Sequence, residues 1–239
     1  MRITRGQQGS APKGDGSRDY VQSLRGQYPG SIITQSYLRS EVQLGTTATS
    51  QFSFNILANQ GTPASSERRL QITDRFAVSA VSVMMLNAAA TAGVISAADR
   101  SQAKLYTWNS PARFTAANSL TLESVYNGFL RMIIDGTTYI DSLDARRFYR
   151  VPVSQQGTIV STGTATASTF PNIQADGYDG THYPFAQLTP AIVLNGAGRN
   201  EITLNTPEAT AVSPSATSAN VLVLYMRGWL IQNASQLNR

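Results

Sequence analysis

The stretch F-L-R-M-I-I-D-G-T-T-Y-I, residues 129–140, gives the clearest structural signal in the sequence. Asp135 and Gly136 stand between two runs that are rich in β-branched and aromatic residues. The two-residue turn of a β-hairpin needs positive φ at both positions, and Asp-Gly is among the pairs that adopt it most readily. The stretch therefore predicts an antiparallel hairpin, which places the chain among proteins built from β-sheets.

The stretch D-A-R-R-F-Y-R-V-P-V, residues 144–153, follows the hairpin and groups three arginines with two aromatic residues. A strand with a period of two would place Arg146 and Arg150 on one face and Arg147 on the other. We therefore predict a third strand of a meander rather than a basic patch that converges on one groove. Pro152 lacks an N–H, which favours a strand end at a sheet edge or a bulge.

Further strands are expected on both sides of this region. Apolar and polar residues alternate, or β-branched residues gather, in segments that span residues 31–44, 51–57, 69–86, 104–108, 185–204 and 220–233. The apolar phase slips after Val78, which predicts a bulge, a bend or two consecutive strands. The last of these segments is interpreted as a pair of strands. One short helix is expected over 118–128, with Ser119 as its candidate N-cap.

Eight to ten short strands with almost no helix predict an all-β protein, an antiparallel sandwich or barrel with at most one or two short helices. A chain of 239 residues is long enough for one large β domain or two smaller ones. We assign a single domain to residues 31–239, with long loops near 154–183 and 206–219. Residues 1–30 are glycine-rich and poor in apolar side chains, so they are predicted to form a flexible N-terminal arm.

The predicted arm is basic. It holds two acidic residues against five basic ones, which are Arg2, Arg5, Lys13, Arg18 and Arg25. A basic, flexible arm is a common means of holding nucleic acid through counterion release. The alternative is an arm that docks on a neighbouring subunit, with Tyr20, Val21 and Leu24 as its anchors. We favour docking, and contact of the five basic residues with nucleic acid stays open.

The composition limits the chemistry that the chain can perform. Only 14% of the residues are charged, the formal net charge is +5 and cysteine is absent. A disulfide framework, a thiol nucleophile and a thiolate metal site are therefore excluded. The first residues contain no apolar run, so we expect no signal peptide. No apolar stretch is long enough to span a bilayer, so we also expect no membrane insertion.

The sequence contains no convincing catalytic or metal-binding motif. His182 is the only histidine, and its D-G-Y-D-G-T-H segment has the residues of a polar turn. Asp176 and Asp179 offer oxygen ligands for calcium, but their spacing does not match an EF-hand loop and a plain turn is favoured. We therefore expect no catalytic residues, no cofactor and no metal site.

Several passages together resemble the jelly-roll capsid proteins of tailless bacteriophages. They are a Gly/Arg arm before a β domain, V-Y-N-G-F-L-R-M-I-I-D-G-T-T-Y-I at 125–140, R-R-F-Y-R-V-P at 146–152, and V-L-V-L-Y-M-R-G-W-L-I-Q-N at 221–233. The resemblance extends over residues 30–233. It implies a jelly-roll sandwich of eight antiparallel strands in two sheets, a location in the virion, and no catalytic residues to carry over.

These observations predict a non-enzymatic structural protein of the virion, most simply a capsid protein that assembles with copies of itself and with other virion proteins. The arm would then contact subunits or genomic nucleic acid, and Arg146 and Arg150 would be edge-strand contacts. One alternative is a carbohydrate-binding or adhesive sandwich, such as a receptor-binding, tail or spike component, with Tyr178, His182 and Tyr183 in its contact loop. A β-sandwich hydrolase is a third possibility.

Overall fold

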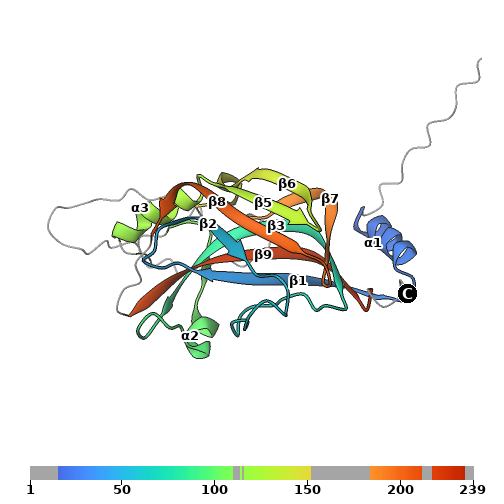
Figure 1. The fold of residues 1–239 in the computed structure, drawn as a ribbon, viewed down its shortest axis with the longest axis horizontal. Coiled ribbons are helices and arrows are strands. Elements are labelled where there is room, and N and C mark those ends of the chain that lie inside the picture. Colours follow the sequence, from blue (N-terminus) through green and yellow to red (C-terminus); the bar gives the residue numbers. More distant parts are fainter. Residues whose placement is uncertain (1–15, 110–113, 115, 152–183, 212–216, 235–239) are drawn as a thin grey trace, which may run out of the picture.

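The fold is given by a computed structural model, which describes residues 16–109, 114, 116–151, 184–211 and 217–234. Within these residues the chain forms two stacked antiparallel β-sheets (Figure 1), which confirms the predicted all-β sandwich. The predicted roles of Arg2, Arg5 and Lys13 and the whole of the predicted loop at 154–183 lie outside the described residues.

The strands divide between a larger and a smaller sheet. The first sheet consists of β1 (Ile32–Gln43), β9 (Ser218–Gln232), β3 (Arg75–Ala89) and β4 (Leu105–Tyr106) in that order, with β7 (Ala186–Asn195) also paired to β3. The second sheet consists of β2 (Thr49–Phe54), β8 (Asn200–Thr210), β5 (Phe129–Ile134) and β6 (Thr137–Asp144). Every pair of neighbouring strands is antiparallel.

The strand pairing follows a single rule. Among the described strands, if the two-residue β4 is left aside, the first pairs with the last (β1 with β9), the second with the second last (β2 with β8), the third with the third last (β3 with β7), and β5 with β6. The chain is therefore a ribbon of strand pairs that rolls up, so that alternate pairs share a sheet through β3–β9 and β5–β8. This arrangement is a jelly roll.

The main core lies between the two sheets. Its buried side chains come from alternate positions of the facing strands, as in Phe52 and Phe54 of β2 and Leu130 and Met132 of β5. A second buried cluster lies on the outer face of the first sheet, where Met84 and Val223 are fully buried. The long strands β3 and β9 are thus covered on both faces for much of their length, which explains their continuous apolar sequence.

Two predictions made from local sequence are confirmed, the turn at Asp135-Gly136 and the irregularity after Val78. Asp135 and Gly136 both have positive φ, 49° and 83°, and they join β5 to β6 with Ile134 paired to Thr137. The phase slip after Val78 is a β-bulge, because the register of β3 shifts there against both of its neighbours. A bulge lets the strand keep its apolar side chains facing the core after an extra residue.

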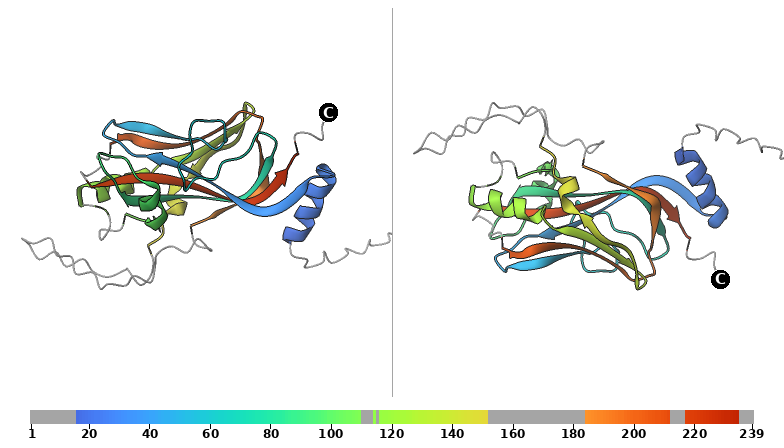
Figure 2. Two further views of the ribbon diagram at one scale, coloured as in Figure 1. Left: turned by 90° about the horizontal axis from the view of Figure 1, so that it is seen from below. Right: turned by 90° about the horizontal axis from the view of Figure 1, so that it is seen from above.

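The described residues form three short α-helices, where at most one or two were expected. The predicted helix is present as α3 (Ala116–Val125), which buries Leu122 and Val125 as expected. It begins two residues earlier than expected, so Ser119 lies inside the helix and is not its N-cap. The short α2 (Ala97–Gln102) is capped by the Ser96 side chain, which accepts a hydrogen bond from the Asp99 N–H. The third helix, α1 (Gly16–Gln27), lies beyond one end of the sandwich (Figure 2).

The prediction of a wholly flexible arm is wrong for its second half. Residues 16–27 form α1, and the Leu24 side chain is only 1% exposed because it packs with Ala77 of β3 and Ile231 of β9. The Tyr20 ring lies 5.0 Å from the Trp229 ring. A few widely spaced apolar residues are therefore enough to hold α1 against one end of the first sheet.

The predicted strand at 144–153 is also wrong. Residues 145–148 form a 3-10 helix, η1 (Ala145–Phe148), because the Asp144 carboxylate accepts a hydrogen bond from the Arg146 N–H at 2.8 Å and caps the turn. Ala145 and Phe148, three residues apart, are then both buried in the core. Buried side chains therefore recur three residues apart, as in a 3-10 helix, and not two residues apart, as was expected for a strand.

Two further boundaries differ from the expectation. Residues 220–233 were predicted to form a pair of strands, but β9 runs through them without a turn, and Gly228 lies directly against the backbone of β3. The loop expected at 206–219 begins later, because β8 continues to Thr210. Pro207 is tolerated there because β5 pairs with β8 only as far as Asn205.

Tyr126 leads to a prediction about stability at alkaline pH. The Tyr126 hydroxyl is buried and has no hydrogen-bond partner among the described residues. Burial, reinforced by the neighbouring Tyr149, raises the pKa of Tyr126 well above its ordinary value of 10.0. In the unfolded chain the phenol loses its proton near pH 10, whereas in the folded chain it keeps it. The free energy of unfolding is therefore not reduced by this group below pH 10, and it falls as the pH rises above 10.

We expect Tyr126→Phe to raise the free energy of unfolding at pH 7 by about 1 kcal/mol, because it removes a buried hydroxyl without a partner. The same substitution should flatten the loss of stability above pH 10. Urea denaturation at pH 7 and at pH 10.5 measures both effects. The control is Tyr139→Phe, because Tyr139 is exposed. A Tyr126→Phe protein that is less stable than the wild type would show that the hydroxyl has a partner.

Candidate functional site

The sequence-predicted contact residues do not come together in one place. Arg25 is exposed on α1, Tyr20 and Val21 are partly buried, and Leu24 packs within its own chain. The predicted docking role of Leu24 is therefore corrected, because its apolar surface is already buried in the folded chain. Arg18 also belongs to α1, and the position of its side chain is not among the described features.

Arg146 is held by contacts within its own chain. Its guanidinium donates to the Glu123 carboxylate at 3.2 Å and lies 4.5 Å from the centre of the Tyr149 ring. The Tyr149 hydroxyl in turn donates to the Asn109 side chain at 3.0 Å. These contacts fix η1 to α3, so Arg146 has a structural role that the edge-strand prediction did not include. Arg150 is exposed next to η1, and no strand carries it.

The outer face of the first sheet carries a row of aromatic rings that we call the aromatic–arginine band. The Tyr37 ring of β1 stacks on the Tyr225 ring of β9 at 5.1 Å, and the Phe185 ring meets Tyr225 edge-on at 5.7 Å. Ser82 of β3 is the lateral neighbour of Tyr225. Because Ser82 is small, the Tyr225 ring and the Phe185 ring can meet across β3.

Arginines occupy both ends of this band. The Arg68 guanidinium lies 5.4 Å from the centre of the Tyr37 ring, and the Arg227 guanidinium lies 4.2 Å from the centre of the Phe185 ring. The ring contacts orient the two planar guanidinium groups. Burial and the neighbouring Tyr37 raise the pKa of Tyr225, and Arg227 and nearby arginines partly oppose this shift.

An ion-pair network anchors the band at the edge of β1. The Glu41 carboxylate is 3% exposed and accepts from Arg39 at 2.7 Å, from the Ser66 hydroxyl at 2.5 Å and from Arg100 of α2. The backbone of Arg39 exchanges two hydrogen bonds with Arg68, each 2.9 Å long. The segment between β2 and β3 is therefore bound to β1, and this fixes the position of Arg68.

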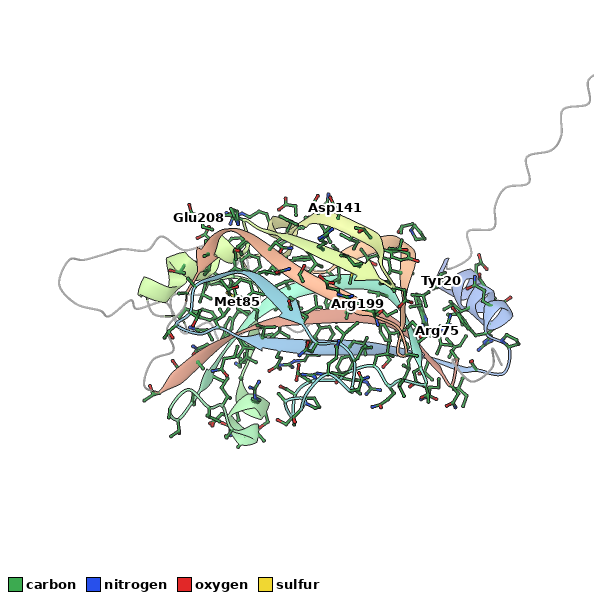
Figure 3. The ribbon with its side chains drawn as sticks, viewed as in Figure 1. Tyr20, Arg75, Met85, Asp141, Arg199 and Glu208 are labelled. Atoms are coloured by element: carbon green, nitrogen blue, oxygen red, sulfur yellow. The ribbon has the colours of Figure 1, made fainter. Side chains whose placement is uncertain are left out.

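The outer face of the second sheet has a different character. No helix covers it in the part of the chain that the structure describes (Figure 1). It presents Gln51, Ser53 and Asn205 together with exposed Phe129, and the Asp141 side chain is 81% exposed (Figure 3). This face therefore combines uncharged polar side chains with an exposed aromatic ring and an exposed carboxylate.

The two sheets carry opposite charge. The strands of the first sheet hold three arginines and one carboxylate, which are Arg39, Arg75, Arg227 and Glu41, for a net charge of +2. The strands of the second sheet hold one arginine and four carboxylates, which are Arg131, Asp141, Asp144, Glu201 and Glu208, for a net charge of −3. The strands of the two sheets therefore differ in the sign of their net charge, with Asp141 and Glu208 on the second-sheet side (Figure 3).

Catalysis and metal binding gain no support from the described residues. Within them, no group of three or more His, Asp or Glu side chains lies close enough to hold a metal ion. Nor does any helix in this part of the chain have the length and apolar character needed to cross a membrane. His182, Asp176 and Asp179 lie outside the described residues, as do Tyr178 and Tyr183 of the predicted contact loop.

Comparisons with known proteins add no relative. No protein-family model, no curated protein and no solved structure matches this chain. The topology therefore defines the class of the protein, a jelly-roll β-sandwich, and the surfaces of the two sheets provide the functional evidence.

Proposed function

We propose that this chain is a non-enzymatic structural protein of a virion, most simply a capsid protein that assembles with copies of itself. The observation that carries the proposal is the pairing of the strands from the outside inwards, because the jelly roll is an architecture of viral capsid domains. Its resemblance to the capsid proteins of tailless bacteriophages, noted in the passages around 125–152 and 221–233, supports the same assignment.

The surfaces also favour a protein that assembles over one that remains a monomer. The second sheet exposes uncharged polar side chains and apolar Phe129, and Tyr139 of β6 is 55% exposed. Such a face gains stability when a second molecule covers it, and exposed aromatic residues are enriched where proteins contact one another. Residues 1–15, which hold Arg2, Arg5 and Lys13, would tie subunits together or contact genomic nucleic acid.

A carbohydrate-binding sandwich is the second candidate, because the jelly roll also occurs in lectins and the band offers aromatic rings. Sugars pack on free ring faces, however, and the Tyr37 ring lies between Tyr225 and Arg68 while Arg227 lies over Phe185. This arrangement favours the structural proposal.

A β-sandwich hydrolase ranks third. The Ser66 hydroxyl does contact a carboxylate, but that carboxylate is Glu41, which is already engaged by Arg39 and Arg100.

Light scattering after size-exclusion chromatography tests the proposal directly. We expect the purified protein to form large particles as its concentration rises, with negative-stain electron microscopy showing closed shells or regular lattices. A protein that stays monomeric at millimolar concentration and at all salt concentrations contradicts the proposal. Binding to a glycan array by such a monomer would instead support the carbohydrate-binding candidate.

Deletion of the N-terminal segment tests the role of the arm. The deletion should stop at residue 15, because removing α1 as well would expose the apolar surface that Leu24 covers. We expect the chain without residues 1–15 to keep its circular dichroism spectrum and thermal midpoint, and to assemble at least about ten-fold less readily. Unchanged assembly would contradict a tethering role of the arm and would leave the sheet faces as the source of contact.

A further inference from the structure

We infer that copies of this chain contact one another head to tail, with the aromatic–arginine band of one copy on the acidic outer face of the second sheet of the next copy. The inference rests on the proposed assembly function and goes further, because it names the two surfaces and the symmetry of the contact. Its observation is the opposite charge of the two sheets, +2 on the strands of the first and −3 on the strands of the second.

The position of the two faces determines the type of contact. They lie on opposite sides of the sandwich, since each is the outer face of one of its two layers (Figures 1 and 2). In a two-fold symmetric dimer, a face would contact the same face of the other copy, so that like charges would meet. A contact between unlike faces avoids this repulsion and continues from copy to copy, as a ring or an extended array.

The basic side of the contact is preorganised. Arg68 is oriented by the Tyr37 ring, so its side chain loses less conformational freedom when it binds a carboxylate. Arg68 is exposed, and its backbone is fixed to β1 through Arg39. Guanidinium groups in fixed positions suit bidentate binding of carboxylates.

The acidic side of the contact is open to a partner. Asp141 has one arginine neighbour within its own chain, Arg131 at 3.6 Å, and its side chain is 81% exposed. Glu201 has a similar long contact with Arg199, also at 3.6 Å. Exposed ion pairs at this distance contribute little to the stability of the fold. Both carboxylates can therefore accept hydrogen bonds from a second molecule. Phe129, exposed on the same sheet, would supply apolar contact.

Charge reversal of each face tests the inference. One variant carries Arg68→Glu and Arg227→Glu, which makes both faces acidic, and the other carries Asp141→Lys and Glu201→Lys, which reverses the acidic face. Each variant alone would bring like charges together, so we expect each to need at least about ten-fold more protein to assemble than the wild type. A mixture of the two should assemble again, because every contact in it joins unlike charges.

Rescue by mixing separates a lost contact from a damaged fold, since two misfolded chains would not restore each other. Arg147→Glu is the matched control, because Arg147 is exposed on η1 and outside both sheets, and its assembly should equal that of the wild type. Wild-type assembly should also weaken as salt rises from 0.05 to 0.5 M, since screening shortens the reach of charge to about 10 Å at 0.1 M.

The outcomes distinguish this inference from the proposed function. If the wild type assembles and both reversed variants assemble equally well, the head-to-tail contact is wrong while the assembly function stands. If the reversed variants fail and their mixture also fails, the charge pairing between the two faces is wrong. If the wild type never assembles under any condition, the proposed function and this inference both fall.

Discussion

A Gly228→Ala chain is expected to lose at least about 3 kcal/mol of folding free energy, or to fail to fold. Gly228 lies in the middle of β9, paired with Ser36 of β1 and Val78 of β3. A Cβ atom at this position would lie 1.8 Å from the carbonyl oxygen of Ala77, which belongs to the backbone of β3. Backbone of a central strand cannot move aside without breaking its ladder on both sides.

Chemical denaturation monitored by circular dichroism measures this loss. The control is Gly26→Ala in α1, where a Cβ would meet no atom within 4 Å. Alanine favours a helix over glycine by up to about 1 kcal/mol, so the control should be neutral or slightly stabilising. The same chemical change thus has opposite signs at two positions. Equal stability of the two variants would show that β9 and β3 are not as close as described.

The second large effect is expected for Glu41→Gln, which should lower the free energy of unfolding by about 2 to 3 kcal/mol. The Glu41 carboxylate, 3% exposed, neutralises Arg39 and Arg100 and accepts from Ser66. Glutamine has nearly the same shape but no charge, so two partly buried guanidinium groups would lose their counter-ion. Both arginines keep some exposure, so water offsets part of the cost.

Urea denaturation of Glu41→Gln beside Glu201→Gln isolates the effect of burial. Glu201 faces Arg199 at 3.6 Å, with both side chains exposed, so its substitution should change stability by less than about 0.5 kcal/mol. Loss of the Glu41 charge should also loosen the segment between β2 and β3, which amide hydrogen exchange would detect at Arg68 and Arg69. An effect of Glu41→Gln no larger than that of Glu201→Gln would contradict the network.

The sequence predicted the fold wherever local chemistry alone determines the structure. The Asp135-Gly136 turn, the slip after Val78 and the α3 helix each depend on residues close in sequence, and each is confirmed. The 3-10 helix at 145–148 was missed because its cause is the Asp144 cap, and a short R-R-F-Y-R run satisfies the period of a strand equally well. The pair of strands predicted over 220–233 is one continuous strand. Its Gly228 is required by the close approach of β3, a contact that the sequence does not display.

The candidate site was predicted less well than the fold. The band consists of side chains from four separate parts of the chain, Tyr37, Arg68, Phe185 and Arg227. They meet only because the strand pairing places β1, β9 and β7 in one sheet. Arg146, which looked significant in the sequence as an edge-strand contact, forms an ion pair that links η1 to α3. The charge difference between the sheets also becomes visible only when each strand is assigned to its sheet.

The outside-in pairing also governs when the protein can fold during its synthesis. β9 lies between β1 and β3, yet it is the last described strand to leave the ribosome. Until residues 218–232 emerge, β3 has an unpaired edge and apolar side chains on both faces, on the order of ten seconds after β1 appears at ordinary elongation rates. The nascent chain therefore needs protection through most of translation, and truncated products should be prone to aggregate rather than to fold in part.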